Sequence, residues 1–217
     1  MNNPELLNDL LKALLETFYM VGISLTLAIV LGIPLGLLLY ITEKGLFAEN
    51  KLVNLVGGFV INVIRSTPYV ILLVLLLPVT QRVIGTTVGP FAASVSLSVA
   101  AIAFYARLVQ SAIWEVDRGV IEAAHAMGAT PRMIITDVLL PESFPGLMRG
   151  MTVTAVSLIG FSAMAGIVGG GGVGDLAIRF GYYRYETDVM LVTVVVLIIL
   201  VQCVQSFGDY LAKRGQR

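Results

Sequence analysis

Five long apolar stretches constrain this chain more than any other feature of its sequence. A helix needs ~20 apolar residues to cross a bilayer core about 30 Å thick, because backbone groups in lipid must pair within their own helix. Four of the stretches contain no charged residue, and the other contains only Arg65. The sequence therefore predicts an all-α membrane protein with five transmembrane helices, at about 18–41, 55–79, 83–106, 150–173 and 189–208.

The composition excludes several classes of protein. Of the 217 residues, 57% are hydrophobic and 13% are charged, whereas about 25% are charged in a typical soluble domain. The formal net charge is zero, so nothing favours a nucleic-acid partner. Cys203 is the only cysteine, which rules out an internal disulfide and a cysteine-based zinc site.

The basic residues predict the orientation of the chain, because short cytoplasmic loops are enriched in Lys and Arg. With Arg65 held apart, nine basic residues fall on one side and four on the other. The nine are Lys44, Lys51, Arg107, Arg118, Arg132, Arg149, Lys213, Arg214 and Arg217, and the four are Lys12, Arg82, Arg179 and Arg184. We therefore expect an outer N-terminal segment 1–12, a transmembrane domain 13–208 with a cytoplasmic loop 107–149, and a cytoplasmic tail 209–217.

Two glycine patterns predict how the spans pack. Gly32 and Gly36 flank Pro34 with a GxxxG spacing, which allows close approach of a neighbouring helix. The run from 169 to 172, followed by Gly174, should end the fourth span and allow movement. It formally fits a dinucleotide-binding pattern, but that pattern has this meaning only between a strand and a helix. We interpret it as a hinge.

The loop 107–149 is long enough to have its own structure. Good helix formers run from 121 to 127, and Gly128 supplies the left-handed conformation that commonly ends a helix. Thr130 is a natural N-cap and Pro131 suits the first helical position. A second helix should run from there to Leu140 and stop at Pro141, with Pro145 separating it from the fourth span.

The first of these short helices is a candidate docking element. Ala123, Ala124 and Ala126 give it a nearly flat face that suits a groove on another protein, and Arg118 and Glu122 would fix its register. The alternative is a solvated connector, which describes most loops. The 43 residues of 107–149 favour function, because loops of this length with their own helices are usually functional.

The spacing within this loop resembles a family signature. Glu122-Ala123-Ala124 is followed by three residues, Gly128, nine residues and then Val138-Leu139-Leu140-Pro141. This is similar to the EAA signature of binding-protein-dependent ABC importer permeases, with Val138 in place of Ile as the single departure. The resemblance implies the type I importer permease fold, with the loop as a cytoplasmic coupling helix seated on an ATPase. The residues implied for ATPase docking are Arg118, Glu122, Ala123, Ala124, Met127, Gly128 and Pro141.

The resemblance also implies a setting and a cargo. Such a permease works in the bacterial inner membrane as a homodimer, with two ATPase subunits that bind ATP and Mg and with a periplasmic or lipoprotein substrate-binding protein. The chain itself would carry no cofactor and would not be an enzyme. Arg65-Ser66-Thr67-Pro68 is similar to an Arg-x-x-Pro element of amino-acid permeases. The amino-acid sequence of residues 128–143 resembles the same region of methionine-uptake permeases of Gram-negative bacteria.

Candidates for the transport pathway are fewer and weaker. Arg65 carries a costly charge within a span, and either a structural or a gating role remains open for it, with Pro68 bending the helix nearby. Ser157, Ser162 and Met164 are the polar or polarisable residues of the fourth span, for which ordinary packing is the alternative. An ion-coupled secondary transporter is the competing function, but the predicted spans lack the Asp, Glu or His such proteins use as relays.

Overall fold

The computed structural model of the protein describes residues 4–46 and 48–214 and consists of helices in this part of the chain. In chain order these are α1 (Pro4–Ile41), α2 (Lys51–Ser66), α3 (Tyr69–Ile84), α4 (Pro90–Trp114), α5 (Arg118–Ala126), α6 (Pro131–Met133), the π-helical η1 (Ile134–Leu139), α7 (Leu140–Ala165), the 3-10 turn η2 (Gly166–Val168), α8 (Gly172–Leu176), the π-helical η3 (Ala177–Tyr182) and α9 (Thr187–Arg214). The predicted all-α class is confirmed.

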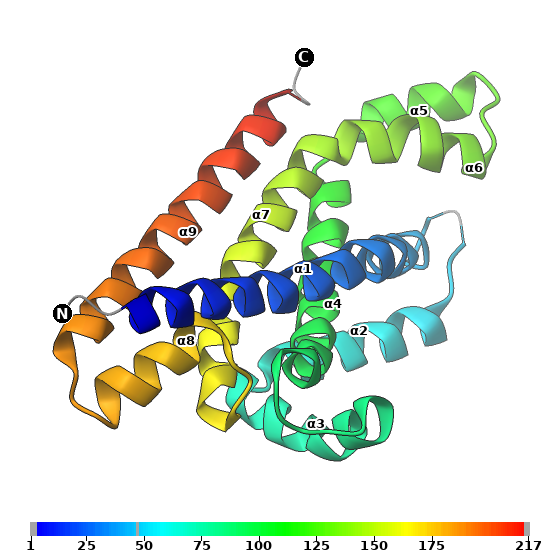
Figure 1. The fold of residues 1–217 in the computed structure, drawn as a ribbon. Coiled ribbons are helices and arrows are strands. Elements are labelled where there is room, and N and C mark those ends of the chain that lie inside the picture. The colour runs from blue at the N-terminus through cyan, green and yellow to red at the C-terminus, as the bar shows by residue number, and fades with distance from the viewer. Residues whose placement is uncertain (1–3, 47, 215–217) are drawn as a thin grey trace.

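The helix α1 is longer than the predicted first span, because the helix begins at Pro4 and runs without a break through Pro34. The segment expected to precede it is therefore part of the same helix over the described residues. Leu6, Leu10 and Ala13 recur at helical spacing, and they pack against Val173 and Leu176 of α8. Figure 1 shows α1 crossing α4, with α8 beside its first half.

Close contact between α1 and α4 confirms that the GxxxG face packs against another helix. A β-carbon added to Gly36 would collide with the Ala106 carbonyl oxygen and lie 2.7 Å from Val109. A β-carbon on Gly32 would lie 3.0 Å from the Tyr105 ring. The backbones approach this closely only because both positions lack a side chain.

The predicted second span is broken rather than continuous. The helices α2 and α3 meet at an angle of 112°, with Thr67 extended and Pro68 at the start of α3. A residue before proline is pushed out of the α region, and proline cannot donate the next helical hydrogen bond, so the helix ends there. The sequence predicted some bending near Pro68, and the observed change of direction is much larger.

The next helix also differs from the predicted third span at both ends. Val83 and Ile84 belong to α3, which Gly85 ends in a left-handed conformation (φ 83°). The helix α4 begins at Pro90 and continues past Arg107 to Trp114. Arg107, which we had placed at the start of the loop, therefore lies inside an apolar helix. Its neighbours Val109 and Ile113 are buried and keep the helix in the core.

The glycine run ends the α7 segment as predicted. Gly169 and Gly171 adopt left-handed φ angles, and α8 starts at Gly172. The new helix end is held by α1, where the Glu16 carboxylate accepts from the Gly172 N–H at 2.8 Å and Thr17 Oγ1 accepts from the Val173 N–H at 3.0 Å. The final helix, α9, then runs through the predicted fifth span and into the predicted tail as far as Arg214.

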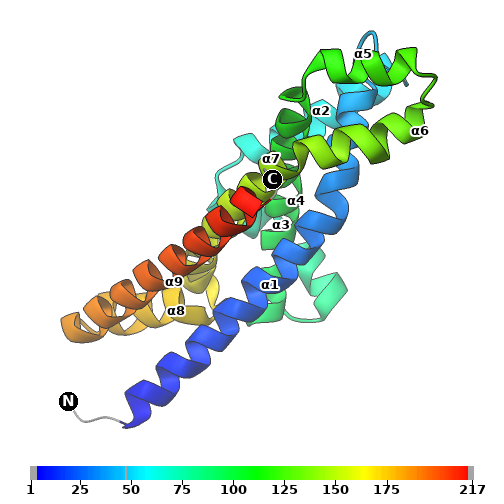
Figure 2. The same cartoon turned by 90° about the horizontal axis from the view of Figure 1, so that it is seen from above.

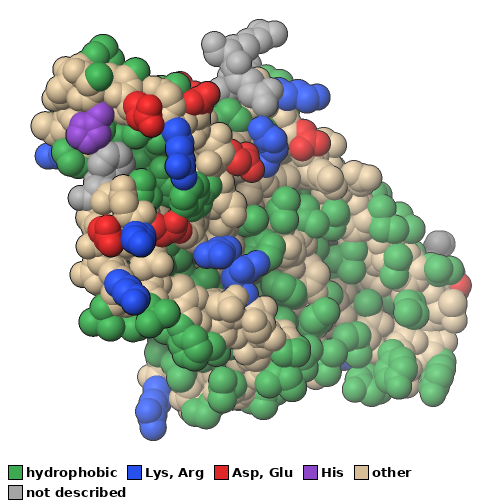
Figure 3. All heavy atoms as spheres, turned by 180° about the vertical axis from the view of Figure 1, so that it is seen from behind, with side chains coloured by type: hydrophobic (Ala, Val, Ile, Leu, Met, Phe, Trp, Pro, Cys, Tyr) green, Lys and Arg blue, Asp and Glu red, His purple; other side chains and the backbone are tan. Residues whose placement is uncertain are grey.

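Among the residues that the structure describes, four helices are long and apolar enough to span a membrane, and there are five if the bent pair of α2 and α3 counts as one span. The four are Leu6–Ile41, Pro90–Trp114, Pro131–Val168 and Thr187–Lys213. Charged side chains gather towards the end of the molecule that carries α5, whereas apolar side chains cover much of the remaining surface (Figure 3). This distribution suits a chain whose long helices contact lipid.

Gly36→Ala should destabilise the fold, because the added methyl group overpacks the contact between α1 and α4. We expect a loss of about 1–3 kcal/mol in the free energy of unfolding. Gly22→Ala is the matched control, since nothing lies within 4 Å of a β-carbon there and alanine favours a helix by about 0.5–1 kcal/mol. Thermal unfolding of both variants in detergent, followed by circular dichroism, tests this. Equal midpoints for the two variants would contradict the role assigned to Gly36.

Candidate functional site

The loop between α4 and η1 forms a compact projection at one end of the molecule. Figures 1 and 2 both place α5 and α6 at this end, near the end of α1. The Asp117 carboxylate caps α5 by accepting from the Gly119 N–H at 2.7 Å, so the helix begins at Arg118, earlier than the predicted 121. An N-cap of this type satisfies an otherwise unpaired donor of the first turn.

The end of α5 confirms the predicted helix stop. Gly128 has a φ of 83°, and its N–H donates to the His125 carbonyl at 3.0 Å. The Ala129 N–H donates to the Ala124 carbonyl at 3.1 Å. These two bonds form a Schellman motif, in which a left-handed residue lets the chain reverse and satisfy the last carbonyls. The turn is therefore well defined.

The second helix of the loop begins where it was predicted to begin. It does not stop at Pro141, where it was predicted to end. Thr130 Oγ1 accepts from the Met133 N–H at 3.4 Å, and Pro131 holds the first helical position. The helix then passes through both Pro141 and Pro145, so that 131–168 is one continuous helical stretch. A π-helical turn precedes Pro141, with the Leu140 N–H donating to the Ile135 carbonyl. This wider turn relieves the clash that a proline ring makes with a tight α turn.

One face of α5 packs against η1, and the other face is exposed. Ala124 is 5% exposed and joins Ile134 and Leu139 in the core. Met127, in contrast, is 83% exposed. Six of the seven residues implied for docking are exposed, namely Arg118, Glu122, Ala123, Met127, Gly128 and Pro141. Ala124 is the exception, and the structure shows it packing within the loop.

The Glu43 carboxylate ties this projection to the end of α1. Glu43 Oε1 accepts from Gln110 Nε2 at 2.6 Å and from Trp114 Nε1 at 3.2 Å. The guanidinium of Arg118 lies 5.4 Å from the centre of the Trp114 ring. A pocket of about 520 Å³ lies between the end of α1 and α5, lined by residues that include Tyr40, Trp114, Arg118, Glu122 and His125.

The structure separates the pathway candidates into two groups. Arg65 and Pro68 lie at the junction of α2 and α3. Ser157 and Ser162 lie on α7, where their hydroxyls donate to Val153 and Ile159 carbonyls at 2.8 Å, and Met164 is 43% exposed. None of the three α7 residues lines the pocket that contains Arg65.

That pocket contains residues that the sequence analysis did not single out. It has a volume of about 360 Å³ and is lined by Asn54, Leu55, Gly58, Phe59, Ile61, Asn62 and Arg65 of α2 and by Arg107 of α4. Arg107 was visible in the sequence as a charge next to a span. Its place in the pocket was missed because a charged residue was taken to end the membrane segment.

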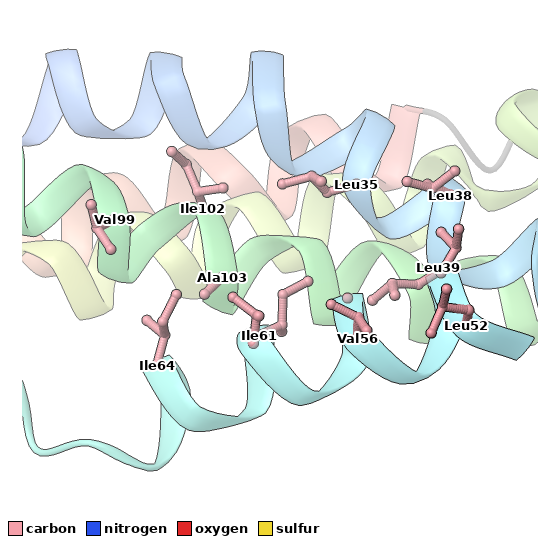
Figure 4. A pocket seen from close by; sticks show the side chains of 13 residues that line it. Leu35, Leu38, Leu39, Leu52, Val56, Ile61, Ile64, Val99, Ile102 and Ala103 are labelled. Carbon is pink, nitrogen blue, oxygen red and sulfur yellow. The ribbon is translucent and has the colours of Figure 1, made fainter.

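An apolar groove lies between α2, α1 and α4. Its volume is about 610 Å³, and Figure 4 shows side chains from the three helices facing one another across it. All thirteen lining residues are leucine, isoleucine, valine, alanine or glycine. Such a surface offers no partner to a charged group, so it is suited to hydrocarbon rather than to a polar ligand.

The chain is similar to proteins of a known transport family. The family described as "Binding-protein-dependent transport system inner membrane component" matches residues 28–217. The chain is 50% identical to the "Probable D-methionine transport system permease protein MetI" of Vibrio cholerae, and 49% identical to the "Methionine import system permease protein MetP" of Bacillus subtilis. Each alignment covers 94% of this chain and 91% of the relative.

Solved structures give the same result. A chain from "Inward facing conformations of the MetNI methionine ABC transporter" superposes with a TM-score of 0.96 at 40% identity, covering 99% of this chain and 100% of that one. The fold is therefore that of a type I ABC importer permease, as the EAA resemblance implied. On the family match and these relatives, the chain belongs to the inner-membrane components of binding-protein-dependent transport systems.

Proposed function

We propose that this chain is the permease subunit of an ATP-driven importer that moves methionine across the bacterial inner membrane. The observation that carries the proposal is 50% identity, along 94% of the chain, to a permease named for D-methionine transport. The similarity to a relative named for methionine import and to a methionine ABC transporter structure supports the same cargo. Both D and L forms fall within this proposal.

The working assembly is proposed to contain two copies of the chain, two ATPase subunits and a periplasmic or lipoprotein substrate-binding protein. ATP and Mg belong to the ATPase, since this sequence carries no P-loop pattern. The excess of basic residues near the α5 end supports a cytoplasmic position for α5 and the C-terminus, with the N-terminus in the periplasm. The ATPases then meet α5, and the binding protein meets the opposite side.

The exposed face of α5 is the proposed docking surface. Glu122, Ala123 and Met127 project from it, and the Gly128 turn sets its end. Closure of the ATPases on ATP would move α5 as a unit, because its two ends are fixed by the Asp117 cap and the Schellman motif. The long helices that follow α5 in the chain then switch the pathway between outward and inward openings, as rigid-body rearrangements of helices do.

The cargo route is proposed to run along the α2–α3 junction and α7. Arg65 and Pro68 contribute a charge and a break in the helix on one side of this route. Met164 offers a polarisable thioether that adapts to a flexible apolar side chain. The hydroxyls of Ser157 and Ser162 bond to their own helix, and their small size rather than their polarity suits close helix approach.

The proposal predicts ATP-dependent uptake. The chain, co-expressed with the products of its neighbouring genes and reconstituted in liposomes, should accumulate labelled methionine only when ATP and the binding protein are supplied together. Hydrolysis of ATP should rise when the loaded binding protein is added. Uptake that follows a proton or sodium gradient, with no copurifying ATPase, would instead support a secondary transporter and remove the proposed function.

Gly128→Val should uncouple ATP hydrolysis from transport. A left-handed conformation costs a non-glycine residue about 1–2 kcal/mol, which corresponds to roughly a five- to thirtyfold change in an equilibrium. We expect uptake to decrease by roughly five- to thirtyfold while basal ATP hydrolysis persists.

The matched control for Gly128→Val is Gly85→Val. Gly85 has the same φ of 83° at the end of a helix and equally open surroundings, but it follows α3, outside the proposed docking surface. Gly85→Val should retain coupled uptake once differences in yield are corrected. An equal loss in both variants would indicate general destabilisation, and undiminished uptake in Gly128→Val would remove Gly128 from the mechanism.

A further inference from the structure

The polar pocket between α2 and α4 contains two positive charges and no negative one. Arg65 and Arg107 reach it from different helices, together with the side-chain amides of Asn54 and Asn62. No acidic residue lines it. Its volume of about 360 Å³ lies within the range of small-molecule sites, roughly 300–1,000 Å³.

Neutral groups orient both guanidinium groups. Arg65 lies 5.9 Å from the centre of the Phe104 ring, and Arg107 Nη1 donates to Gln110 Oε1 at 2.7 Å. Within residues 4–46 and 48–214, no carboxylate forms an ion pair with either arginine. Their charges are therefore held in place without being directly neutralised.

The pocket lies on helices that are long and apolar enough to belong to membrane spans. Arg65 is in the last turn of α2, which passes as one span together with α3. Arg107 lies inside α4, which can itself span a membrane. Because ionisable groups within spans are costly and usually functional, two arginines in one pocket indicate a ligand of opposite charge.

We propose that Arg65 and Arg107 bind the carboxylate of an amino-acid cargo during its passage, an assignment that rests on the proposed function. Guanidinium groups form strong charge-assisted hydrogen bonds with a carboxylate. Asn54 Nδ2 already donates to the Leu39 carbonyl at 2.7 Å and to Thr42 Oγ1 at 3.2 Å. The Asn54 amide nitrogen is therefore already engaged in the contact with the end of α1.

The apolar groove complements this site. The two concavities share Ile61 of α2, and the groove is lined by apolar side chains and glycine alone. A zwitterion cannot pair its charges there, whereas the arginine pocket provides both a positive partner and amide groups. The chemistry therefore assigns the charged end of a cargo to the pocket and leaves the groove to hydrocarbon.

The test is ligand binding to the complete permease–ATPase complex in nanodiscs of phosphatidylcholine, without the binding protein. Saturation-transfer NMR would compare L-methionine with methioninol, in which a hydroxymethyl group replaces the carboxylate. The unsubstituted complex should prefer methionine. Arg65→Gln and Arg107→Gln should each weaken methionine binding by about tenfold or more, as loss of a charged hydrogen bond does, and should abolish the preference.

Two control variants test whether weaker binding reflects the loss of the arginine charge or a loss of structure. Arg65→Lys keeps the charge and should retain part of the preference. Arg82→Gln makes the same change at an exposed arginine outside the pocket and should bind like the unsubstituted complex. Methionine bound elsewhere in the assembly contributes equally to every complex, so the differences report on this pocket. Equal binding by Arg65→Gln and Arg82→Gln would overturn the assignment.

An anionic lipid headgroup is the other source of a negative charge. Native mass spectrometry of the complex in nanodiscs that also contain phosphatidylglycerol distinguishes it. Retention of this lipid by the unsubstituted complex, its loss in Arg65→Gln, and no methionine preference in either would overturn the cargo site. Failure of ATP-dependent methionine uptake by the unsubstituted complex would instead overturn the proposed function, so the two failures are distinguishable.

Discussion

The close approach of α1 to α4 is the contact on which the rest of the structure depends. Gly32 and Gly36 let the two backbones meet, and α4 continues this with a sequence of small residues that are nearly all buried. Because many buried side chains of α4 are small, four other helices can pack around it, namely α1, α2, α3 and α7. In lipid no hydrophobic force draws helices together, so such close contact supplies the packing energy that holds them. A bulky α4 would leave these helices without a common centre.

The same two helices connect the membrane domain to the α5 projection. Glu43, just beyond α1, accepts hydrogen bonds from Gln110 and Trp114 near the end of α4, and Trp114 in turn lies against Arg118 at the start of α5. The start of α5 is therefore linked, through Trp114, to the carboxylate that joins the end of α1 to α4. Gln110 also accepts from Arg107, which lines the arginine pocket. The proposed docking surface and the proposed cargo site are thus joined by a continuous series of polar contacts.

The sequence predicted those features that local chemistry determines. Apolar length predicted the helical class, and Gly128 and Thr130 predicted the turn after α5, because their preferred conformations hold with few outside contacts. Three features were not foreseen: the size of the bend near Pro68, which is 112°, the passage of one helix through Pro141 and Pro145, and the placement of Arg107 inside an apolar helix. Pro68 follows the end of α2, whereas α1 and α7 continue through Pro34 and Pro145. Sequence alone does not distinguish these outcomes.

The position of charge within the membrane domain explains why the pathway candidates were hard to identify from the sequence. A single Arg65 in an apolar run is consistent with snorkelling, with packing on an aromatic ring or with ligand binding. The structure adds a second arginine from another helix and two amides, and it shows that neither guanidinium forms an ion pair with a carboxylate among the described residues. Convergence of like charges is unfavourable unless an anion offsets it. The lining of one pocket by two arginines, with no carboxylate paired to either among the described residues, is therefore the observation on which the proposed ligand rests.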